Sequence, residues 1–300
     1  MFLGEWCKLY SRKCKWSKID FEILPYHWDD RSRLYGDYQY LKDFHEILLI
    51  DLTSQLNQIH KVEHDVRYWR ILIGPWLGLF TQILFDRWSC IQAAVSNYDL
   101  SGTIVLTGNE EVLIPNDMAD FTSRLIVGND WDHYIYSTIL KQFTDVPCFE
   151  KEKKQSELIE NDTIPRNNWK DTIKRAILKF YNLSANKLTR DQDAFFLSTY
   201  ISYISELKIN WRLRQVFQLR RSGPAVNVEV DIRQRKWVVN GQNISKFESF
   251  ARSIIPQQIP VLYLEGYNQL MKQVDSLTWP KNPKVIFTSN SHYSDDVFKA

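Results

Sequence analysis

The sequence predicts an α/β fold, in which a Rossmann-like, doubly wound sheet is combined with a large helical content. Short apolar or β-branched runs, such as TIVLT at residues 103–107, have the length and composition of buried parallel strands. Longer segments repeat apolar residues every three or four positions, as amphipathic helices do. Near the C-terminus the two kinds of segment alternate, and this alternation is typical of a doubly wound sheet.

The expected elements follow in order along the chain. Residues 1–3 read as the end of a buried strand, and residues 37–61 as an amphipathic helix. Residues 67–96 are also helical, and Pro75 either kinks one long helix or lies in the first turn of a second one. After the strand at 103–107 we expect a strand at 146–150, a strand or a short helix at 194–205, and helices at 117–127, 131–143, 169–181 and 244–254.

The C-terminal part is expected to begin a second domain. Strands within 259–267 and 285–288 flank a helix that ends near residue 277, and one turn of another helix closes the sequence. Such a turn cannot bury a face by itself, so we expect both ends to be cut relative to the functional unit. The expected domains are therefore an N-terminal α/β domain over 1–255, with a flexible charged segment at about 150–168, and a hinge with the start of a truncated second α/β domain over 256–300.

Composition excludes several classes of protein. The 300 residues are 44% hydrophobic and 25% charged, which is typical of a soluble globular protein. A net charge of +2 gives no domain-wide basic field, so we expect no nucleic-acid partner. Four cysteines without a C-x-x-C pair fit reduced thiols and a cytoplasmic location. The longest apolar run, 71–84, is interrupted by glycine and proline, so no transmembrane segment is expected.

The ends of the expected strands supply the first candidate ligand contacts. In open α/β sheets, ligands bind beyond the carboxyl ends of the strands. This rule selects Glu5 and Glu265, each after an apolar run, together with Ser289 and Asn290 before a helix N-terminus that would attract a phosphate. None of these loops matches the glycine-rich phosphate-binding motifs, and no metal-ligand constellation is present. We therefore expect no bound cofactor and no metal.

The stretch PYHWDDR, residues 25–31, concentrates reactive side chains before a helix. One interpretation makes His27 or Asp29 a general base, with Asp30 beside them and Arg31 paired with a carboxylate or a diphosphate. The other makes this stretch a helix start, where an aspartate caps the helix and the aromatic side chains pack inward. Adjacency in the sequence does not decide between the two.

A second cluster lies in RYWRILIGPWLG, residues 67–78. Arg67 and Arg70 share a helical face and suit phosphate recognition, and an exposed Trp76 would suit stacking on a sugar or a base. The alternative is an arginine clamp on the acidic residues 29–30, with the tryptophans in the core. The pattern Asp130-x-Asp132 resembles a divalent-ion motif, but helix capping is the favoured interpretation.

Several phrases together resemble a family of transferases encoded in bacterial loci for surface carbohydrates, such as O-antigen and capsule. The resemblance covers most of the chain, more weakly between about 145 and 255, and RYWRILIGPWLGLFTQILFDRW is its most specific part. The other phrases are FLGEWCKLYSRK, LPYHWDDR, YLKDFHEILL and PKVIFTSNSHYSDDVFKA.

The resemblance implies a glycosyltransferase-B-like enzyme with two Rossmann-type halves, of which this chain is the first, acceptor-side half. Its partners would be a nucleotide-activated sugar and a glycan or lipid-linked glycan acceptor, with peripheral contact at the inner face of the membrane. One of Glu5, His27, Asp29 and Asp30 would then deprotonate the acceptor, and Arg67 and Arg70 would hold phosphate or carboxylate charge. The second half would bind most of the donor, so activity of this chain alone is in doubt.

Two alternatives stay open on the sequence. The first is a non-catalytic subunit that binds glycan or assembles a surface-polysaccharide pathway, with its tryptophans and arginines gripping a saccharide or a partner. The second is an α/β hydrolase that modifies nucleotides, and the absence of a G-x-S-x-G motif counts against it.

Overall fold

A computed structural model gives the structure of the protein, and it describes residues 1–108, 110–127, 129–152, 188–217, 226, 228–242, 244–277 and 279–300. The helix expected at 169–181 and nearly all of the segment expected to be flexible lie outside these residues. The chain divides into two compact units, Met1–Lys153 with Val228–Glu265, and Lys154–Asn227 with Gly266–Ala300. The two domains expected at 1–255 and 256–300 stay a prediction.

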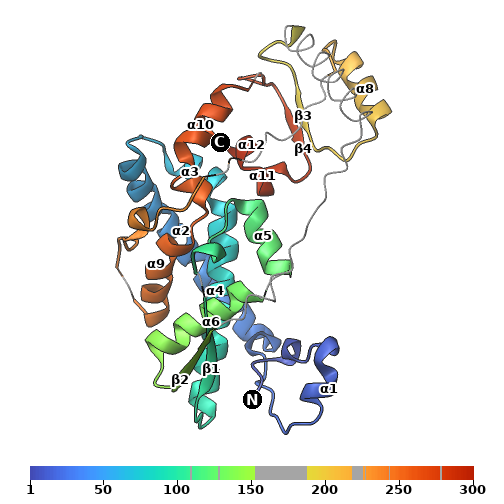
Figure 1. The fold of residues 1–300 in the computed structure, drawn as a ribbon. Helices are drawn as coiled ribbons and strands as arrows, with labels where there is room; N and C mark the ends of the chain where they lie inside the picture. The colour runs from blue at the N-terminus through green and yellow to red at the C-terminus, as the bar shows by residue number, and fades with distance from the viewer. Residues whose placement is uncertain are drawn as a thin grey trace. The chain divides into compact units, whose positions relative to one another are not determined.

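The first unit is built mainly from helices (Figure 1). Its helices are α1 (Lys13–Trp16), α2 (Arg31–His60), α3 (Val66–Leu72), α4 (Gly74–Asn97), α5 (Met118–Val127), α6 (Asp130–Phe143) and α9 (Lys246–Gln258). Short 3-10 helices span Glu5–Cys7, Tyr10–Arg12, His27–Asp29, Glu110–Leu113, Ile232–Arg235 and Val261–Tyr263. Strands β1 (Thr103–Thr107) and β2 (Cys148–Glu152) complete it.

Helices α2 and α4 pack side by side at the centre of this unit. Helix α2 begins after Asp30 and ends at Lys61, whose left-handed backbone (φ 57°) stops the helix. Leu41, Leu48 and Leu52 on its apolar face are buried. Helix α4 is separate from α3, with Pro75 in its first turn, where a missing N–H breaks no helical hydrogen bond.

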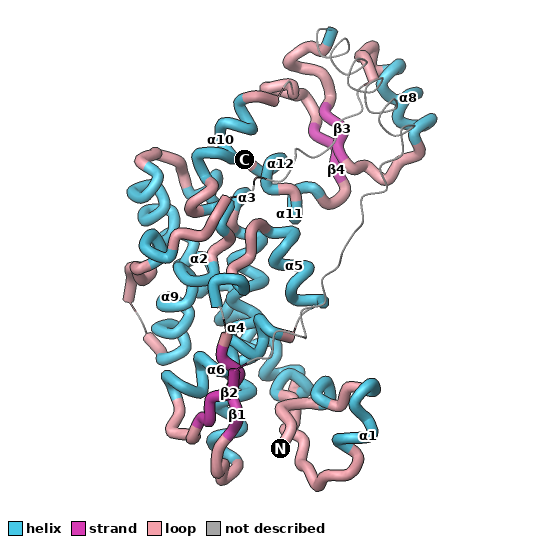
Figure 2. Tube along the Cα trace, viewed as in Figure 1, coloured by secondary structure: helices cyan, strands magenta, loops and turns pink. Residues whose placement is uncertain are grey.

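The described strands form two separate two-stranded parallel sheets, which Figure 2 colours magenta. Thr103 to Thr107 pair with Cys148 to Glu152 in one sheet, and Phe195 to Leu197 with Ile286 to Thr288 in the other. A doubly wound sheet is not seen among the described residues, so that fold class stays a prediction.

Two expected strands have other forms. The strand expected at residues 1–3 is a single parallel bridge between Phe2 and Ile23. The strand expected within 259–267 is wrong, because Val261–Tyr263 is a buried 3-10 helix whose Val261 and Leu262 N–H groups bond to Pro115 and Asn116. A short apolar run does not distinguish a buried strand from a buried helical turn.

The core of the first unit is aromatic. Trp69, Trp76 and Trp131 are completely or almost completely buried. Trp76 stacks on Phe80 with ring centroids 4.9 Å apart, and Phe80 meets Trp131 edge to face at 5.9 Å. For these three tryptophans the interpretation as core residues is therefore confirmed.

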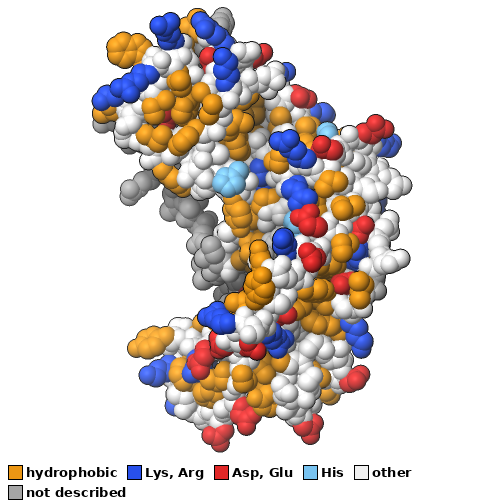
Figure 3. Space-filling model, turned by 180° about the vertical axis from the view of Figure 1, so that it is seen from behind, with side chains coloured by type: hydrophobic (Ala, Val, Ile, Leu, Met, Phe, Trp, Pro, Cys, Tyr) orange, Lys and Arg blue, Asp and Glu red, His pale blue; other side chains and the backbone are white. Residues whose placement is uncertain are grey.

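The second unit contains β3 (Phe195–Leu197), α8 (Tyr203–Arg212), α10 (Tyr267–Asp275), β4 (Ile286–Thr288), α11 (Ser291–Ser294) and α12 (Asp296–Lys299). Its helix α8 has an unusual polarity: Asn210 is buried, whereas Ile204 and Trp211 are 65% and 83% exposed. Hydrophobic and basic side chains gather on the surface over α8 (Figure 3). No described helix in either unit combines the length and hydrophobicity that a bilayer crossing needs.

Candidate active site

A cavity of about 950 Å³ opens in the first unit between the N-terminal segment and helices α4 and α6. The bridge between Phe2 and Ile23 holds residues 2–5 beside the stretch that leads into His27–Asp29. Helix α4 and the start of α6 supply the remaining walls. Four carboxylates therefore line one hollow, from Glu5, Asp29, Asp86 and Asp132, with Arg87 as their basic neighbour.

The rim of the cavity is aromatic. Trp6 is 47% exposed and meets Tyr26 edge to face, with ring centroids 5.5 Å apart. Its ring lies so close to Gly4 that a Cβ on Gly4 would be 2.2 Å from it. Gly4 is therefore needed for this close approach, and its backbone (φ 173°) is extended and makes no tight turn. An exposed indole at a cavity rim suits stacking on a ring-shaped ligand.

A buried pair, His27 and Asp86, adjoins the cavity, and Asp86 forms part of its wall. The Nε2 atom of His27 is 3.7 Å from Oδ1 of Asp86, and both side chains are less than 10% exposed. Neither atom has a hydrogen-bond partner among the described residues. The second oxygen of Asp86 accepts a hydrogen bond from Arg87. Burial lowers the pKa of His27, and the nearby Asp86 carboxylate opposes that change.

Arg87 joins two of the cavity carboxylates. Its Nε and Nη2 atoms donate to Oδ1 of Asp132 at 3.1 and 3.0 Å, and Nη1 donates to Asp86. The guanidinium also lies over the ring of Tyr136 at 5.6 Å. Burial raises the pKa values of Tyr26 and Tyr136 far above their usual range, so both phenols stay protonated. The site thus combines charged groups that are already paired with each other and phenol hydroxyls that can donate hydrogen bonds.

His27, Asp86 and Cys90 could in principle hold a metal, since their ligand atoms lie within 4.8 Å of one another. However, His27 faces Cys90 through Nδ1 at 3.9 Å and Asp86 through Nε2, whereas one ion would use one nitrogen. Burial also raises the pKa of Cys90 to about 12, and metal binding needs a thiolate. The same protonated, buried thiol is unsuited to act as a nucleophile. The group fits an imidazole held between a carboxylate and a thiol.

Comparison with known proteins identifies the family. A model of the LIC12162 family of transferases matches residues 1–300. The chain belongs to this family. The expectation of a transferase is thereby confirmed. Comparison with curated proteins gave no match, and neither did comparison with solved structures.

The transferase brings three of its predicted catalytic residues together. Glu5 and Asp29 line the cavity, and His27 lies buried beside them in the same 3-10 turn as Asp29. Asp30 takes the capping role that the sequence left open, since its Oδ1 accepts hydrogen bonds from the N–H groups of Ser32 and Arg33 at 2.9 and 3.2 Å at the start of α2. Its neighbour Arg31 is exposed in the first turn of α2 and does not line the cavity.

The arginine cluster of the transferase lies elsewhere. Arg67 is exposed on α3 and is not part of the cavity wall. Arg70 donates to both oxygens of Glu46, at 2.5 and 2.6 Å, so it clamps α2 and not residues 29–30. This pair lowers the pKa of Glu46 to about 2. Trp76 has no exposed surface, so the expectation that it stacks on a ligand is wrong.

The remaining predicted contacts also lie outside this cavity. Glu265 forms a buried ion pair with Arg235, in which Nε and Nη2 each approach one carboxylate oxygen to 2.6 Å. Asn290 is exposed and donates to the Tyr200 hydroxyl at 3.0 Å, and the exposed Ser289 donates its N–H to the backbone of Ser198. These last two residues belong to the second unit.

Sequence reasoning missed Asp86 and Arg87, and it favoured a capping role for Asp132. The signal for the first was an aspartate within the apolar helix ILFDRW, where a buried carboxylate needs a partner. Asp132 was interpreted as a cap, but Asn129 holds the cap position of α6 and Asp132 binds Arg87. Only the fold could reveal that contact.

Proposed function

We propose that this transferase moves a sugar from a nucleotide-activated donor to a hydroxyl group of a bacterial surface glycan, and that the cavity binds the acceptor. The transferase family and the resemblance to surface-carbohydrate enzymes support the reaction class. A glycosyltransferase-B-like architecture remains part of the proposal. Carboxylates that accept hydrogen bonds and an indole at the rim suit the hydroxyl groups and the apolar faces of a sugar ring.

The charge of the cavity favours the acceptor over the donor. Glu5, Asp29, Asp86 and Asp132 contribute four negative charges, and the guanidinium of Arg87 is already bound to two of them. A diphosphate placed here would meet like charges without a free cation. A neutral, hydroxyl-rich molecule meets no such repulsion.

Asp29 is the best candidate for the general base. Glu5 is paired with Lys8 at 2.5 Å, Asp30 caps α2, and Arg87 binds Asp86 and Asp132. Asp29 lines the cavity, and within the described parts of the chain its carboxylate has no ion-pair or hydrogen-bond partner. The assignment of Asp29 as the base therefore rests on its carboxylate being unpaired in the described structure, whereas the neighbouring carboxylates each bind a cation or a backbone N–H group.

The proposed reaction is a displacement at the anomeric carbon of the donor. The acceptor oxygen forms a bond to the anomeric carbon of the donor, while the bond from that carbon to the nucleotide phosphate breaks and the nucleotide leaves with the electron pair. The hydroxyl proton moves to the Asp29 carboxylate. His27, which is buried beside Asp86 in the same 3-10 helix as Asp29, is a positioning residue for that turn.

The test uses Asp29→Asn in the full-length protein, with the exposed Asp20→Asn as the matched control. Binding of methyl glycosides of glucose, galactose, mannose and N-acetylglucosamine is measured by saturation-transfer NMR. Release of nucleotide is measured with a panel of UDP-, GDP-, CMP- and dTDP-sugars and the same glycosides as acceptors. We expect Asp29→Asn to keep glycoside binding and to lower transfer by about 10²–10⁴-fold.

Undiminished transfer in Asp29→Asn would overturn the assignment of the base. Glycoside binding without any nucleotide release would favour the non-catalytic glycan-binding alternative. For His27→Asn we expect a lower kcat with an unchanged KM for the glycoside. Added imidazole should not restore transfer, because the position of the His27 ring is buried.

A further inference from the structure

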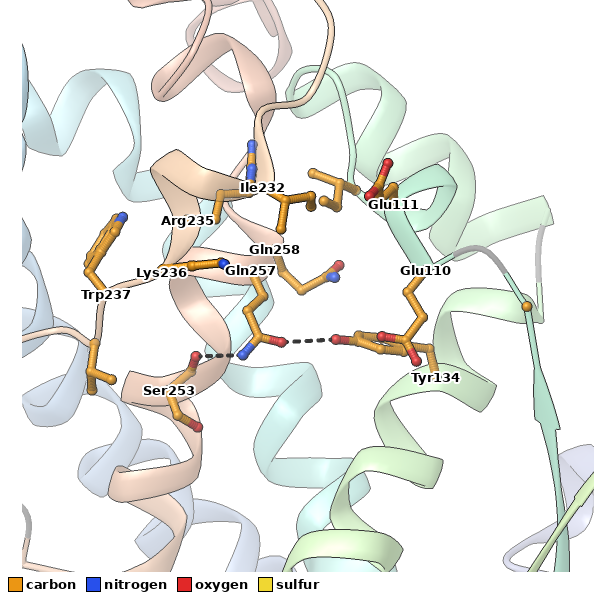
Figure 4. Close-up of a pocket in the computed structure, with 13 residues that line it drawn as sticks. Glu110, Glu111, Tyr134, Ile232, Arg235, Lys236, Trp237, Ser253, Gln257 and Gln258 are labelled. Carbon is orange, nitrogen blue, oxygen red and sulfur yellow. Dashed lines mark hydrogen bonds between the residues drawn. The ribbon is translucent and has the colours of Figure 1, made fainter.

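A second cavity, of about 570 Å³, lies in the first unit and takes no part in the chemistry proposed above. It opens where β1 ends, between the 3-10 helix Glu110–Leu113 and the segment that joins Ile232–Arg235 to α9. Figure 4 shows Lys236 and Trp237 on one wall and Glu110, Glu111 and Tyr134 on the opposite wall. Its volume is that of a small-molecule site.

Arg235 anchors the basic wall. Nε and Nη2 of its guanidinium bind Glu265, and Nη1 donates to the carbonyl oxygens of Pro256 and Ile259 at 3.1 and 2.8 Å. These bonds occupy the side chain, so it offers no charge to a ligand. They fix the backbone that presents the next two residues, Lys236 and Trp237.

Lys236 provides an ammonium group and Trp237 an indole ring on the same wall. Lys236 is exposed, and among the described residues it has no carboxylate within ion-pair distance. The Nε1 atom of Trp237 donates to the carbonyl of Gln234 at 2.9 Å, which holds a half-buried indole in place. An ammonium group beside a fixed indole suits an anionic group attached to a flat ring.

The opposite wall offers acceptors and an amide. Glu110 and Glu111 are exposed carboxylates that accept hydrogen bonds from hydroxyl groups. The Tyr134 hydroxyl donates to Oε1 of Gln257 at 3.1 Å, and Nε2 of Gln257 donates weakly to the Ser253 carbonyl at 3.3 Å. This leaves one N–H of the carboxamide for a ligand. Charge is thus separated between the walls, in contrast to the cavity that contains Asp29.

We propose that this second cavity binds a nucleoside phosphate. The phosphate lies at Lys236, the base stacks on Trp237, and the ribose hydroxyls bond to Glu110 and Glu111. This inference concerns nucleotide binding alone, and it does not depend on the proposed transfer at Asp29. The ligand has its anion at the basic wall and its hydroxyl donors at the acidic wall, as the lining requires.

The experiment is calorimetric titration of the full-length protein with UMP, UDP, ADP and GDP, with uridine and inorganic phosphate as partial ligands. We expect one or more of these nucleotides to bind, and Lys236→Gln to weaken that binding at least about tenfold while leaving uridine unaffected. Trp237→Leu should weaken nucleotide and nucleoside alike by about tenfold. Lys246→Gln, an exposed lysine outside the cavity, is the matched control and should change nothing.

Trp237→Phe keeps an aromatic ring and should retain binding within a few-fold, which separates loss of stacking from loss of folding. Phenylalanine, which joins an amine and a carboxylate to a ring, probes the same walls. The proposal is overturned if no nucleotide binds, if Lys236→Gln and Trp237→Leu leave binding unchanged, or if phenylalanine binds and nucleotides do not. None of these outcomes bears on glycoside binding or on Asp29→Asn, so the two proposals fail separately.

Discussion

Two buried pairs of the first unit, Arg235–Glu265 and His27–Asp86, differ in how completely their polar atoms are engaged. At Arg235–Glu265 both charges are almost fully buried, the pair is bidentate, and the backbone of Asp231 adds a third hydrogen bond to the carboxylate. At His27–Asp86 the closest atoms are 3.7 Å apart, and both lack a hydrogen-bond partner in the described structure.

The difference indicates two uses of buried polar pairs. A fully engaged pair fixes the fold locally, and removing one partner leaves an uncompensated charge. An incompletely engaged pair at a cavity stores unused hydrogen-bonding capacity, which is typical of functional sites.

Glu265→Gln should have the largest effect on stability. It leaves the Arg235 guanidinium buried without its counter-charge, and we expect a loss of about 3–5 kcal/mol in the free energy of unfolding. Urea denaturation followed by circular dichroism measures it. The double variant Arg235→Met with Glu265→Leu removes both charges and should recover most of the loss. A loss below about 1 kcal/mol for Glu265→Gln would remove the distinction between the pairs.

Asp86→Asn should cost less, about 1–3 kcal/mol. Arg87 keeps its two bonds to Asp132, so no guanidinium is left without a carboxylate. The same urea denaturation measurement, made in parallel on Glu265→Gln and Asp86→Asn, shows which variant loses more free energy of unfolding. A greater loss for Asp86→Asn would show that the two pairs have the reverse of the roles assigned to them.

The pH dependence of stability tests the buried imidazole. Because burial lowers the pKa of His27 in the folded protein, the unfolded chain takes up a proton first as the pH falls. Stability should therefore be at its full value above about pH 7 and should decrease toward pH 5, with at most about 1.4 kcal/mol per pH unit from one imidazole. His27→Gln should flatten this decrease. His60, whose pKa is also lowered by burial, supplies the control, because His60→Gln should leave the contribution of His27 intact.

Arg70→Gln should have the smallest effect, below about 1 kcal/mol. The Arg70–Glu46 pair has similarly short contacts to Arg235–Glu265, but both of its side chains are more than 40% exposed. Water can therefore solvate the partner that remains. Comparing its denaturation midpoint with that of Glu265→Gln isolates the contribution of burial. Equal losses in the two variants would contradict that explanation.

The sequence predicted the features that depend on local periodicity. The helix expected at 37–61 is the greater part of α2, and the helical stretch at 67–96 corresponds to α3 and α4. Asp30 has the chemistry of a helix cap and acts as one. The convergence of Glu5, His27 and Asp29 also followed, although a single backbone bridge brings them together and not a row of strand ends.

The features that depend on contacts distant in the sequence could not be predicted in this way. Nothing local indicates that Asp86 and Asp132, 46 positions apart, share Arg87. The pairing of Glu265 with Arg235 depends on the course of the chain between them, which the sequence does not show. The position of Glu265 after an apolar run therefore suggested a ligand contact instead of a buried ion pair. The prediction that Trp76 is exposed and stacks on a ligand was wrong, because this large apolar side chain is buried in the core.

Helix α6 contributes to both cavities, since Asp132 and Tyr136 line one and Tyr134 lines the other. With 3.6 residues per turn, Tyr134 points away from the side that its two neighbours share. A tilt of α6 would therefore change the shape of both cavities at once. If a ligand in one cavity favoured such a tilt, it would change the affinity of the other cavity for its ligand, and the second ligand would change the affinity for the first by the same factor.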